Sequence, residues 1–338
     1  MEISPRKEKI LSSVVQGFVA SGEPVGSKAI AEAIGVSSAT VRSDMADLIE
    51  LGLLEQPHTS AGRVPSQRGY REYVDRLMEV PVLSDAERRY FDSALTAGSF
   101  DAEQLLQRSG RLLAGVTRCA SVVTTPSGAQ ARVQAVQLVQ TGRRTAMLIL
   151  MSSAGTMKSR VFHCDYDLTS EMLRIFFRAF NQRVTGREVG EITPAFLQTM
   201  GVSLGEMYML AAPALQALYE TARETLQTEV ILDGQMNLLF YGELEHRQVI
   251  GFLERREELA ALLAQKPGRV IAMIGREAGY GELRDVSLLI SRYTVGGQDA
   301  GALAVLGPTR VDYARITAIL EYLTGAVSRM LTLLLREA

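Results

Sequence analysis

Apolar residues recur at helical spacing through the first fifty positions of the chain. Two series carry this pattern: Ile10, Leu11, Val14, Val15 and Phe18, and then Val41, Met45, Leu48 and Ile49. Residues three or four positions apart lie on one face of a helix, so each series predicts an amphipathic helix with one buried side. A shorter helix of small residues is expected between them, over 27–33. The pattern therefore predicts three helices around a common core.

Short polar residues and glycines mark the ends of the third helix. Ser37 suits its N-cap, because a serine hydroxyl accepts a hydrogen bond from a free backbone N–H, and Gly52 suits its end. Residues 53–56 and Val64 then predict two short strands around a tip of small residues, 59–63. Two helices, a turn, a third helix and a β-wing make a winged helix-turn-helix, in which the third helix enters the major groove of DNA.

The polar face of the third helix and the tip of the wing supply the candidates for DNA contact. Arg42 is the main candidate for a guanine or a phosphate, and Arg63 is expected to reach the groove or backbone from the wing. Arg42 could instead pair with an acid on its own helix, such as Asp47 or Glu50. His58 could meet a phosphate or only stabilise the wing. The residues expected at the DNA are Ser27, Lys28, Ser38, Ala39, Thr40, Arg42, Ser43, His58, Thr59, Ser60, Arg63 and Arg68.

The chain then leaves this first domain. A helix is expected over 67–78, and a linker around Pro81. Ser84 and Glu87 have the spacing of a capping box, which predicts a second helix over 85–95. Another amphipathic helix should follow, and this pair would connect the DNA-binding domain to the rest of the protein.

Runs rich in β-branched and aliphatic residues predict strands in two separated parts of the chain. The first group is 121–125, 133–140, 145–151 and 158–163, and the second is 269–274, 286–293 and 302–306. A long amphipathic helix is expected over 312–335. Strands that return after an interruption suggest one α+β domain with another domain inserted into it. The expected boundaries are 1–80 for the first domain, 81–184 and 269–338 for the discontinuous α+β domain, and 185–268 for the insert.

The insert is expected to be mainly helical. Pro213 should divide one helix from the next, and 248–264 should form a single amphipathic helix. Residues 230–239, with a turn at Gly234, predict a hairpin or a paired strand. The apolar faces of these elements could be internal core as well as a contact surface.

Composition places the chain among globular proteins. It has 338 residues, of which 47% are hydrophobic, which suits two or three domains with buried cores. Its longest apolar runs, such as 145–151, stop well short of the roughly eighteen residues that a membrane span needs, and its N-terminus is charged. Cys119 and Cys164 are too few for a disulfide framework. A cytoplasmic protein without a membrane partner is expected.

The charge of the first domain is unusual for a nucleic-acid binder. Residues 1–80 carry nine Lys and Arg against eleven Asp and Glu, whereas such domains are usually basic. The segment 56–71 is locally basic, with three arginines and no acid. Few phosphate contacts and modest non-specific affinity are therefore expected, so that two domains would have to bind together. A homodimer is the expected state.

Residues with catalytic or metal-binding chemistry do not gather in a recognisable motif. His58, His163 and His246 lie in separate segments without metal-ligand spacing. The glycine-rich segment 275–281 lacks the Lys-Ser/Thr ending of a P-loop and is expected to form turns. The turn 307–310 before the last helix could hold an anion or simply cap that helix. No enzymatic activity, metal or cofactor is expected.

Several motifs closely resemble those of the HrcA heat-inducible transcription repressors. They lie at 22–27, 38–48, 56–65, 69–74 and 307–313. The resemblance implies a GAF-like body, an insert that helps to make the dimer, and repression of chaperone operons through an inverted-repeat operator called CIRCE. It also implies that the GroE chaperonin keeps the repressor active. Ser43 stands where that family usually has Asn, and it lies on the expected reading face.

Two functional classes follow, and both bind DNA. The first is a dimeric repressor with one recognition helix in the major groove of each half-site. The second is a regulator controlled by a small effector in the GAF-like body, although strands lined by Val, Ile, Leu and Met favour a filled core. Pairing between strands more than a hundred residues apart also predicts slow folding, which would make active repressor depend on chaperonin supply.

Overall fold

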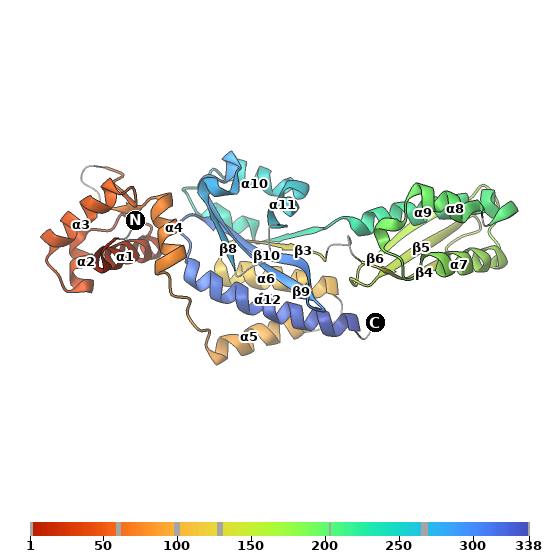
Figure 1. The fold of residues 1–338 in the computed structure, drawn as a ribbon, viewed down its shortest axis with the longest axis horizontal. Coiled ribbons are helices and arrows are strands. Elements are labelled where there is room, and N and C mark those ends of the chain that lie inside the picture. Colours follow the sequence, from red (N-terminus) through yellow and green to blue (C-terminus); the bar gives the residue numbers. More distant parts are fainter. Residues whose placement is uncertain are drawn as a thin grey trace.

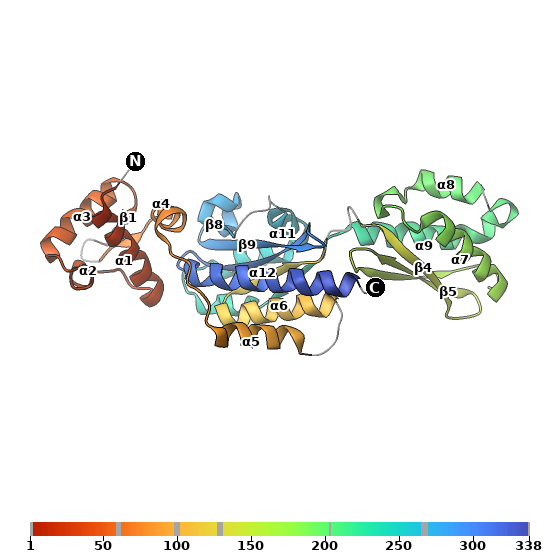
Figure 2. The same ribbon diagram turned by 60° about the horizontal axis from the view of Figure 1, so that its bottom comes forward.

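Three bodies in a row make up the molecule (Figures 1 and 2). A helical N-terminal domain lies at one end, a central body contains a five-stranded sheet, and a second α+β domain lies at the other end. The computed structural model describes residues 3–58, 62–97, 102–126, 131–202, 204–264 and 270–336. The chain leaves the central body for the far domain and later returns, so the far domain is an insertion.

The N-terminal domain has the expected winged-helix layout. Its elements are α1 (Pro5–Ser21), α2 (Ser27–Ile34), α3 (Ser38–Glu50), β1 (Leu54–Glu55), β2 (Val64–Pro65) and α4 (Gln67–Glu72), followed by a π-helical turn, Tyr73–Leu77. The apolar faces of the helices form its core, which includes Ile10, Leu11, Val14, Val41 and Leu48. These are residues whose spacing predicted the helices, so the core of this domain follows from the local pattern.

Two glycines let segments of this domain approach one another closely. A Cβ on Gly62 would lie 2.5 Å from the carbonyl oxygen of Val25, the residue against which the base of the wing pairs. A Cβ on Gly69 would lie 2.0 Å from the carbonyl oxygen of Leu53. Any side chain at either position would push the backbone segments apart, so both glycines hold the wing against the helical core.

A five-stranded antiparallel sheet forms the central body. Its strands are β3 (Ala120–Thr124), β7 (Val230–Asp233), β8 (Ile271–Ile274), β9 (Val286–Val295) and β10 (Gln298–Pro308), in the order β7-β3-β10-β9-β8. One face packs against α6 (Ala102–Thr117) and α12 (Tyr313–Arg336), outside which lies α5 (Asp85–Thr96). The other packs against the 3₁₀ turn η5 (Gln235–Phe240), α10 (His246–Glu254) and α11 (Arg256–Leu263). Apolar side chains thus fill both faces.

The last helix accounts for the most apolar span of the described residues. Tyr313–Leu335 is the one described span that is long and apolar enough to cross a membrane by length and composition. It belongs to α12, which packs along β9 and buries Ile316, Leu320 and Leu323. These residues belong to the stripe that the sequence predicted, and its contact with the sheet explains their apolar character.

The inserted domain has a sheet of its own. Its strands are β4 (Val133–Gln140), β5 (Thr145–Ser152) and β6 (Met157–His163), and its helices are α7 (Ser170–Val184), α8 (Pro194–Val202) and α9 (Tyr208–Leu226). One face of this sheet packs against α7 and α9 around a separate core that includes Val136, Leu148, Phe176, Phe180 and Leu218. The insert is therefore an α+β domain and not the mainly helical one that was expected.

The position of the insert also differs from the expected boundaries. The expected boundaries place 133–163 in the discontinuous domain and 230–263 in the insert, and the sheet pairing exchanges the two segments. β3 pairs with β7 and β10, while β4 pairs only with β5. The composition of a strand indicates whether its side chains are buried, but it does not indicate which other strand pairs with it. The expected boundaries differ from the observed ones for this reason.

Three elements differ locally from expectation. Pro213 lies inside α9, where its missing N–H removes one hydrogen bond near the start of the helix. The segment 248–264 is interrupted at Arg255 and forms α10 and α11. Of the two alternatives for 230–239, the paired strand is confirmed for β7, which pairs with β3, whereas the residues after Gly234 form η5 and not the second arm of a hairpin.

Candidate nucleic-acid interface

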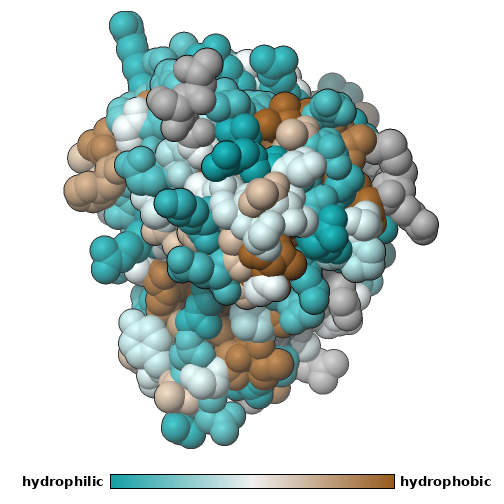
Figure 3. Space-filling view, turned by 90° about the vertical axis from the view of Figure 1, so that its left-hand side faces the viewer, coloured by the Kyte–Doolittle hydropathy of each residue, from teal (hydrophilic) through white to brown (hydrophobic). Residues whose placement is uncertain are grey.

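The N-terminal half of α3 presents a polar surface without acidic side chains. Its exposed residues up to position 46 are Ala39, Arg42, Ser43 and Ala46. Ser37 caps the helix as predicted, since its Oγ accepts the N–H of Thr40 at 3.0 Å and shares a hydrogen bond with the Thr40 hydroxyl at 2.8 Å. Figure 3 views the molecule from this end, where hydrophilic side chains predominate and apolar ones are scattered. The surface suits hydrogen bonding to a polar partner.

Arg42 has no hydrogen-bond or ion-pair partner within the described ranges. The two acids that could have paired with it are engaged elsewhere or remain apart. Asp47 Oδ2 lies 2.8 Å from Lys7 Nζ, and Glu50 forms no ion pair with a described residue. The alternative of an ion pair on its own helix is therefore not formed, and the guanidinium can bind a phosphate or a base edge.

Asp44 lies two positions after Arg42 but faces the core. Its carboxylate accepts two hydrogen bonds from Arg6, from Nε at 2.6 Å and from Nη2 at 3.2 Å. This pairing raises the pKa of Arg6 above its ordinary value. Together with the Lys7–Asp47 pair, it balances the charge of two acids of α3. Asp44 is thus removed from the surface that would meet DNA, whereas the Asp47 side chain is 46% exposed and Glu50 is exposed at the C-terminal end of α3.

The N-termini of α2 and α3 meet beside this surface. Ser27 Oγ and Ser38 Oγ share a hydrogen bond of 3.0 Å, and Lys28 is exposed next to them. A helix N-terminus carries free N–H groups and a partial positive charge, both of which favour phosphate oxygens. The structure therefore brings Ser27, Lys28 and Ser38 together with the N-terminal turns of α3.

The described part of the wing is held to the helical core at its base. Val25 and Arg63 exchange two backbone hydrogen bonds of 2.9 Å each. The Arg63 side chain is half-buried, and its Nη1 donates to the carbonyl of Gly62 at 3.4 Å. His58 is exposed where the tip begins. Two further candidates, Thr59 and Ser60, lie outside the described residues.

Arg68 is not brought together with the other candidates. Its Nη1 donates to the carbonyl of Leu51 at 3.1 Å, at the C-terminal end of α3. A cation there satisfies a free carbonyl and interacts favourably with the helix dipole. The remaining candidates of α2 and α3 gather at the opposite end of α3, so the contact made by Arg68 is a helix cap.

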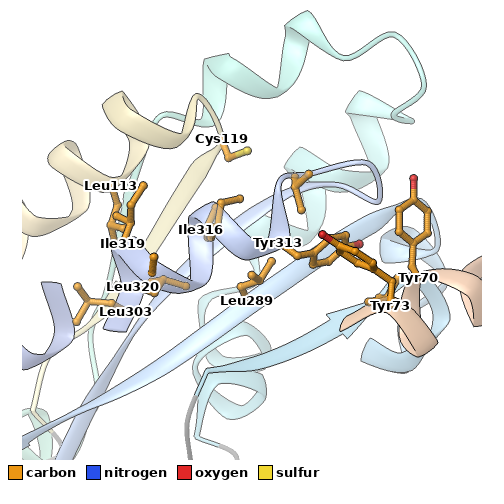
Figure 4. Close-up of a cluster of buried hydrophobic side chains, with 14 of the residues drawn as sticks. Tyr70, Tyr73, Leu113, Cys119, Leu289, Leu303, Tyr313, Ile316, Ile319 and Leu320 are labelled. Atoms are coloured by element: carbon orange, nitrogen blue, oxygen red, sulfur yellow. The ribbon is translucent and has the colours of Figure 1, made fainter. Parts of the chain in front are cut away.

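Residues that sequence reasoning left without a role join the winged helix to the central body. The rings of Tyr70 and Tyr313 lie 5.7 Å apart, centroid to centroid (Figure 4). Arg71 forms an ion pair with Glu277 of the glycine-rich turns. The sequence signals for this contact were the motifs 69–74, 275–281 and 307–313, which stood out without pointing to one another. They form the docking surface for α4.

The turn that could have held an anion is occupied from within the protein. Arg310 Nε pairs with Glu243 Oε1 at 2.5 Å, and the Tyr313 hydroxyl donates to the carbonyl of Thr309 at 2.6 Å.

Other candidate reactive or metal-binding groups are also accounted for. Burial raises the pKa of the Cys119 thiol to about 11, which disfavours the reactive thiolate. In the part of the chain that the structure describes, no group of three or more His, Cys, Asp or Glu could hold a metal ion.

The central sheet face that could have received an effector is filled. Side chains of β3, β9 and β10 pack there against η5, α10 and α11, and residues such as Val122, Phe252, Leu259 and Leu288 are fully or almost fully buried. The described side chains of this core are apolar, whereas a site for a small ligand needs a few polar groups that fix its orientation. This arrangement favours a structural core over a binding pocket.

Comparisons with known proteins agree with this geometry. The family model "Winged helix-turn-helix transcription repressor, HrcA DNA-binding" matches residues 2–76, and "HrcA protein C terminal domain" matches residues 103–317. The heat-inducible transcription repressor HrcA of Desulforudis audaxviator is 36% identical over 345 residues, covering 99% of this chain and all of that protein. The same repressor of Carboxydothermus hydrogenoformans is 33% identical over 335 residues, 97% of this chain and 98% of the relative.

One solved structure shares the whole fold. It is described as a crystal structure of a hypothetical protein at 2.2 Å resolution, and it has a TM-score of 0.65 at 23% identity over 98% of this chain and all of that one. The family matches and the relatives together span nearly the full length, including the winged helix and the C-terminal domain. The chain therefore belongs to the HrcA family of heat-inducible transcription repressors.

Proposed function

We propose that two copies of this repressor bind an inverted-repeat operator of the CIRCE type in the cytoplasm and so repress chaperone operons. Each copy would place α3 in the major groove of one half-site, with its wing on the adjacent backbone or groove. The GroE chaperonin would keep the repressor in its active form. The proposed function requires neither an enzymatic step nor a cofactor.

The exposed surface of α3 is the observation that carries this proposal. Arg42 projects from it without a partner in the described residues, next to Ser43 and the paired N-termini of α2 and α3. An arginine can donate two hydrogen bonds to a guanine, and helix N-termini favour phosphates. Few other cations are available to the surface, so a single winged helix should bind weakly and two should bind together.

An apolar sheet face on the insert supports a homodimer. α7 and α9 cover the inner face of the β4-β5-β6 sheet, whereas the outer face packs against no core of the described residues. Its apolar residues are Val139, Met147, Ile149, Met151, Met157 and Val161. Val139, Met157 and Val161 are 44%, 66% and 52% exposed, respectively. A contiguous apolar patch of this kind marks an interaction site, and a second copy would cover it.

Long-range strand pairing supports the dependence on a chaperonin. The central body cannot form its sheet until β3, β7 and β10 meet, although the insert separates the first two in the chain. Non-local pairing is slow and leaves strand edges and apolar surface exposed. If unfolded repressor refolds and binds operator equally well with and without GroE at heat-shock temperature, this part of the proposal is wrong.

The experiment that tests DNA binding is a gel-shift titration of the full-length protein. Three duplexes would be compared at two salt concentrations: the CIRCE inverted repeat, a single half-site and a scrambled sequence. Tight binding to the repeat, weak binding to the half-site and little binding to the scrambled duplex are expected, because both winged helices must engage. Equal and strongly salt-dependent binding to all three would mean backbone contact only and would contradict the proposal.

A further inference from the structure

We propose that Arg71 is a positioning residue for operator binding: it holds the winged helix at the angle to the central body that matches the spacing of two half-sites. Arg71 lies in α4, on the side of the domain that faces the central body, and it belongs to none of the surfaces expected at the DNA. The inference rests on the proposed binding of an inverted repeat. In this inference, one side chain fixes the angle between the winged helix and the central body that binding to both half-sites requires.

The Arg71 guanidinium ties α4 to an edge strand and a turn of the central body. Its Nη2 donates to the carbonyl of Ala272 in β8 at 2.6 Å, and its Nε donates to Glu277 Oε1 at 3.1 Å. Its Nη2 also pairs with the other oxygen of Glu277, so that the contact with the carboxylate is bidentate. The side chain is 30% exposed, which shields these bonds partly from solvent. A fork of this kind fixes direction as well as distance.

The partner of Arg71 is itself held in place. Glu277 Oε2 accepts the N–H of Ile274 at 2.9 Å, which locks the carboxylate onto the turn that follows β8. Gln67, one helical turn before Arg71, donates from Nε2 to the carbonyl of Ile274 at 2.8 Å. Arg71 and Gln67 of α4 therefore both bind the C-terminal end of β8 and the turn that follows it. A rotation of α4 against β8 would break the hydrogen bonds of both side chains.

The other contacts across this junction are less directional. Tyr70 and Tyr313 meet through their rings, and no described residue hydrogen-bonds the buried Tyr70 hydroxyl. Beside this ring contact, a cleft of about 820 Å³ separates α1 from the start of α12, with Val19 and Val311 among its lining. Apolar contact depends on area and not on angle, so it permits rotation that hydrogen bonds resist. Arg71 and Gln67 supply that resistance.

The angle matters because the two recognition helices must reach grooves a set distance apart. The winged helix lies at one end of the molecule and the insert, which carries the proposed dimer surface, at the other (Figure 1). Rotation at α4 therefore moves α3 relative to its counterpart in the second copy. A domain that rotates freely still binds one half-site, but the second half-site is met at a lower effective concentration.

The test compares variants of the full-length protein on matched duplexes. Arg71→Met removes the fork and keeps the apolar stem, while Arg71→Lys keeps the charge but not the bidentate geometry. Glu72→Gln is the control, because it breaks the Arg76–Glu72 ion pair within the same segment without touching the central body. The duplexes are the inverted repeat, one half-site, and repeats whose spacer is lengthened by one base pair or by about five, half a helical turn.

Arg71→Met is expected to bind the half-site within about twofold of the wild type and the full repeat at least about tenfold more weakly, with less discrimination between spacers. Arg71→Lys should lie between the two, and Glu72→Gln should behave as the wild type. Unchanged affinity for the full repeat and unchanged spacer preference in Arg71→Met would overturn the inference. Equal losses on the half-site and on the repeat would also overturn it, because they would indicate damage to the winged helix itself.

Two further measurements separate this inference from its premises. A wild type that does not prefer the full repeat to the half-site would contradict the proposed function, and not the role of Arg71. If Arg71→Met fails to fold by circular dichroism, Gln67→Leu decides, since it removes the bond to the Ile274 carbonyl from another position. Gln67→Leu is expected to weaken spacer discrimination in the same direction, and a variant with wild-type discrimination would overturn the inference.

Discussion

Two charged residues near the start of α3 have opposite surroundings. Arg42 projects into solvent with no partner in the described ranges, while Asp44 is 4% exposed and paired with Arg6. An unpaired exposed guanidinium costs little when the protein is free and gains charge-assisted hydrogen bonds when DNA arrives. An unpaired buried carboxylate would be costly, and Arg6 removes that cost. The same helix thus separates a binding charge from a structural one.

Truncation of Arg42 tests whether it reads a base. Arg42→Ala is expected to weaken operator binding by about 1–3 kcal/mol and to relax the preference at one base pair, because a bidentate contact is lost. Gel shifts against half-sites changed one base pair at a time would measure both effects. Arg89→Ala, at an exposed position of α5 in the central body, is the control. An unchanged sequence preference in Arg42→Ala would show that Arg42 contacts only the backbone.

A single methyl group at Gly69 should disturb the wing. Gly69→Ala would place a Cβ 2.0 Å from the Leu53 carbonyl oxygen, and the required backbone shift is expected to lower the free energy of unfolding by about 1–3 kcal/mol. Gly115→Ala on α6 is the control, since nothing lies within 4 Å of that Cβ, and it should raise stability by up to roughly 1 kcal/mol through helix propensity. Urea denaturation of the full-length variants would measure both, and equal effects would contradict the argument.

Residue roles were predictable from the sequence where spacing alone decides them. The helical period predicted that Val41 would be buried and Arg42 exposed, because Val41 belongs to the apolar stripe of α3 and Arg42 lies outside it. It could not predict that Asp44 would pair with Arg6, 38 positions earlier, or that Arg68 would cap Leu51. Such contacts depend on how helices pack, and packing is a property of the folded domain.

At the scale of elements, α5 is attached to the central body through its first turn. Glu87 forms an ion pair with Arg315 of α12, and its other oxygen accepts the N–H of Ser84 at 2.8 Å and the Ser84 hydroxyl at 2.7 Å. The Arg315 hydrogen bond, followed by those from Ser84, lowers the pKa of Glu87 from about 4.5 to about 2. The predicted capping box thus also anchors one helix on another.

This pKa predicts a pH dependence of stability. The folded protein favours the Glu87 carboxylate more than the unfolded chain does, so the contribution is complete above about pH 4.5 and is lost as the pH falls toward 2. Glu87→Gln is expected to melt below the wild type at neutral pH, and the difference should shrink across that window. Thermal melts of both proteins at several pH values measure it. A pH-independent difference would contradict this assignment, and Glu32→Gln, at an exposed position of α2, is the control.

Helix starts were easier to predict than helix breaks. The caps at Ser37 and Ser84 follow from local chemistry and lie where the sequence placed them. The break at Arg255 does not follow from local chemistry, and it lies where Arg255 pairs with Glu282, 27 positions later, at 2.5 Å. The apolar stripe continues through the break, so the spacing of apolar residues does not reveal it.

At the scale of the whole molecule, the outer face of the insert sheet predicts the oligomeric state. Val161→Lys places a charge at the middle of β6 on this face and should shift the protein to monomers in sedimentation velocity, because a buried unpaired charge opposes association. Binding to the full repeat should fall to the level of a half-site. Val202→Lys, at an 81% exposed position of the same domain, is the control. A Val161→Lys dimer would place the interface elsewhere.

The topology was the least predictable feature of the fold. The sequence identified most strands within a residue or two, yet it joined β4, β5 and β6 to the wrong sheet. Buried and half-buried residues alternate along β5, whereas β3 is buried on both faces, but neither pattern identifies the strand that lies next to it. What separates them is the pairing of β3 with β7 and β10, a contact between segments that no local pattern relates.

The order of strands in the central sheet determines when the sheet can be completed during synthesis of the chain. β10 lies in the middle of the sheet and is the last strand to be made, so β7-β3 and β9-β8 remain two separate halves until it emerges. The N–H of Ala302 bonds to Thr124 Oγ1, 178 positions earlier. At about 5–20 residues per second, β3 waits roughly 10–40 s on the ribosome for its neighbour. During that interval, every new molecule of the repressor has an unpaired edge at β3, and it cannot yet bind an operator.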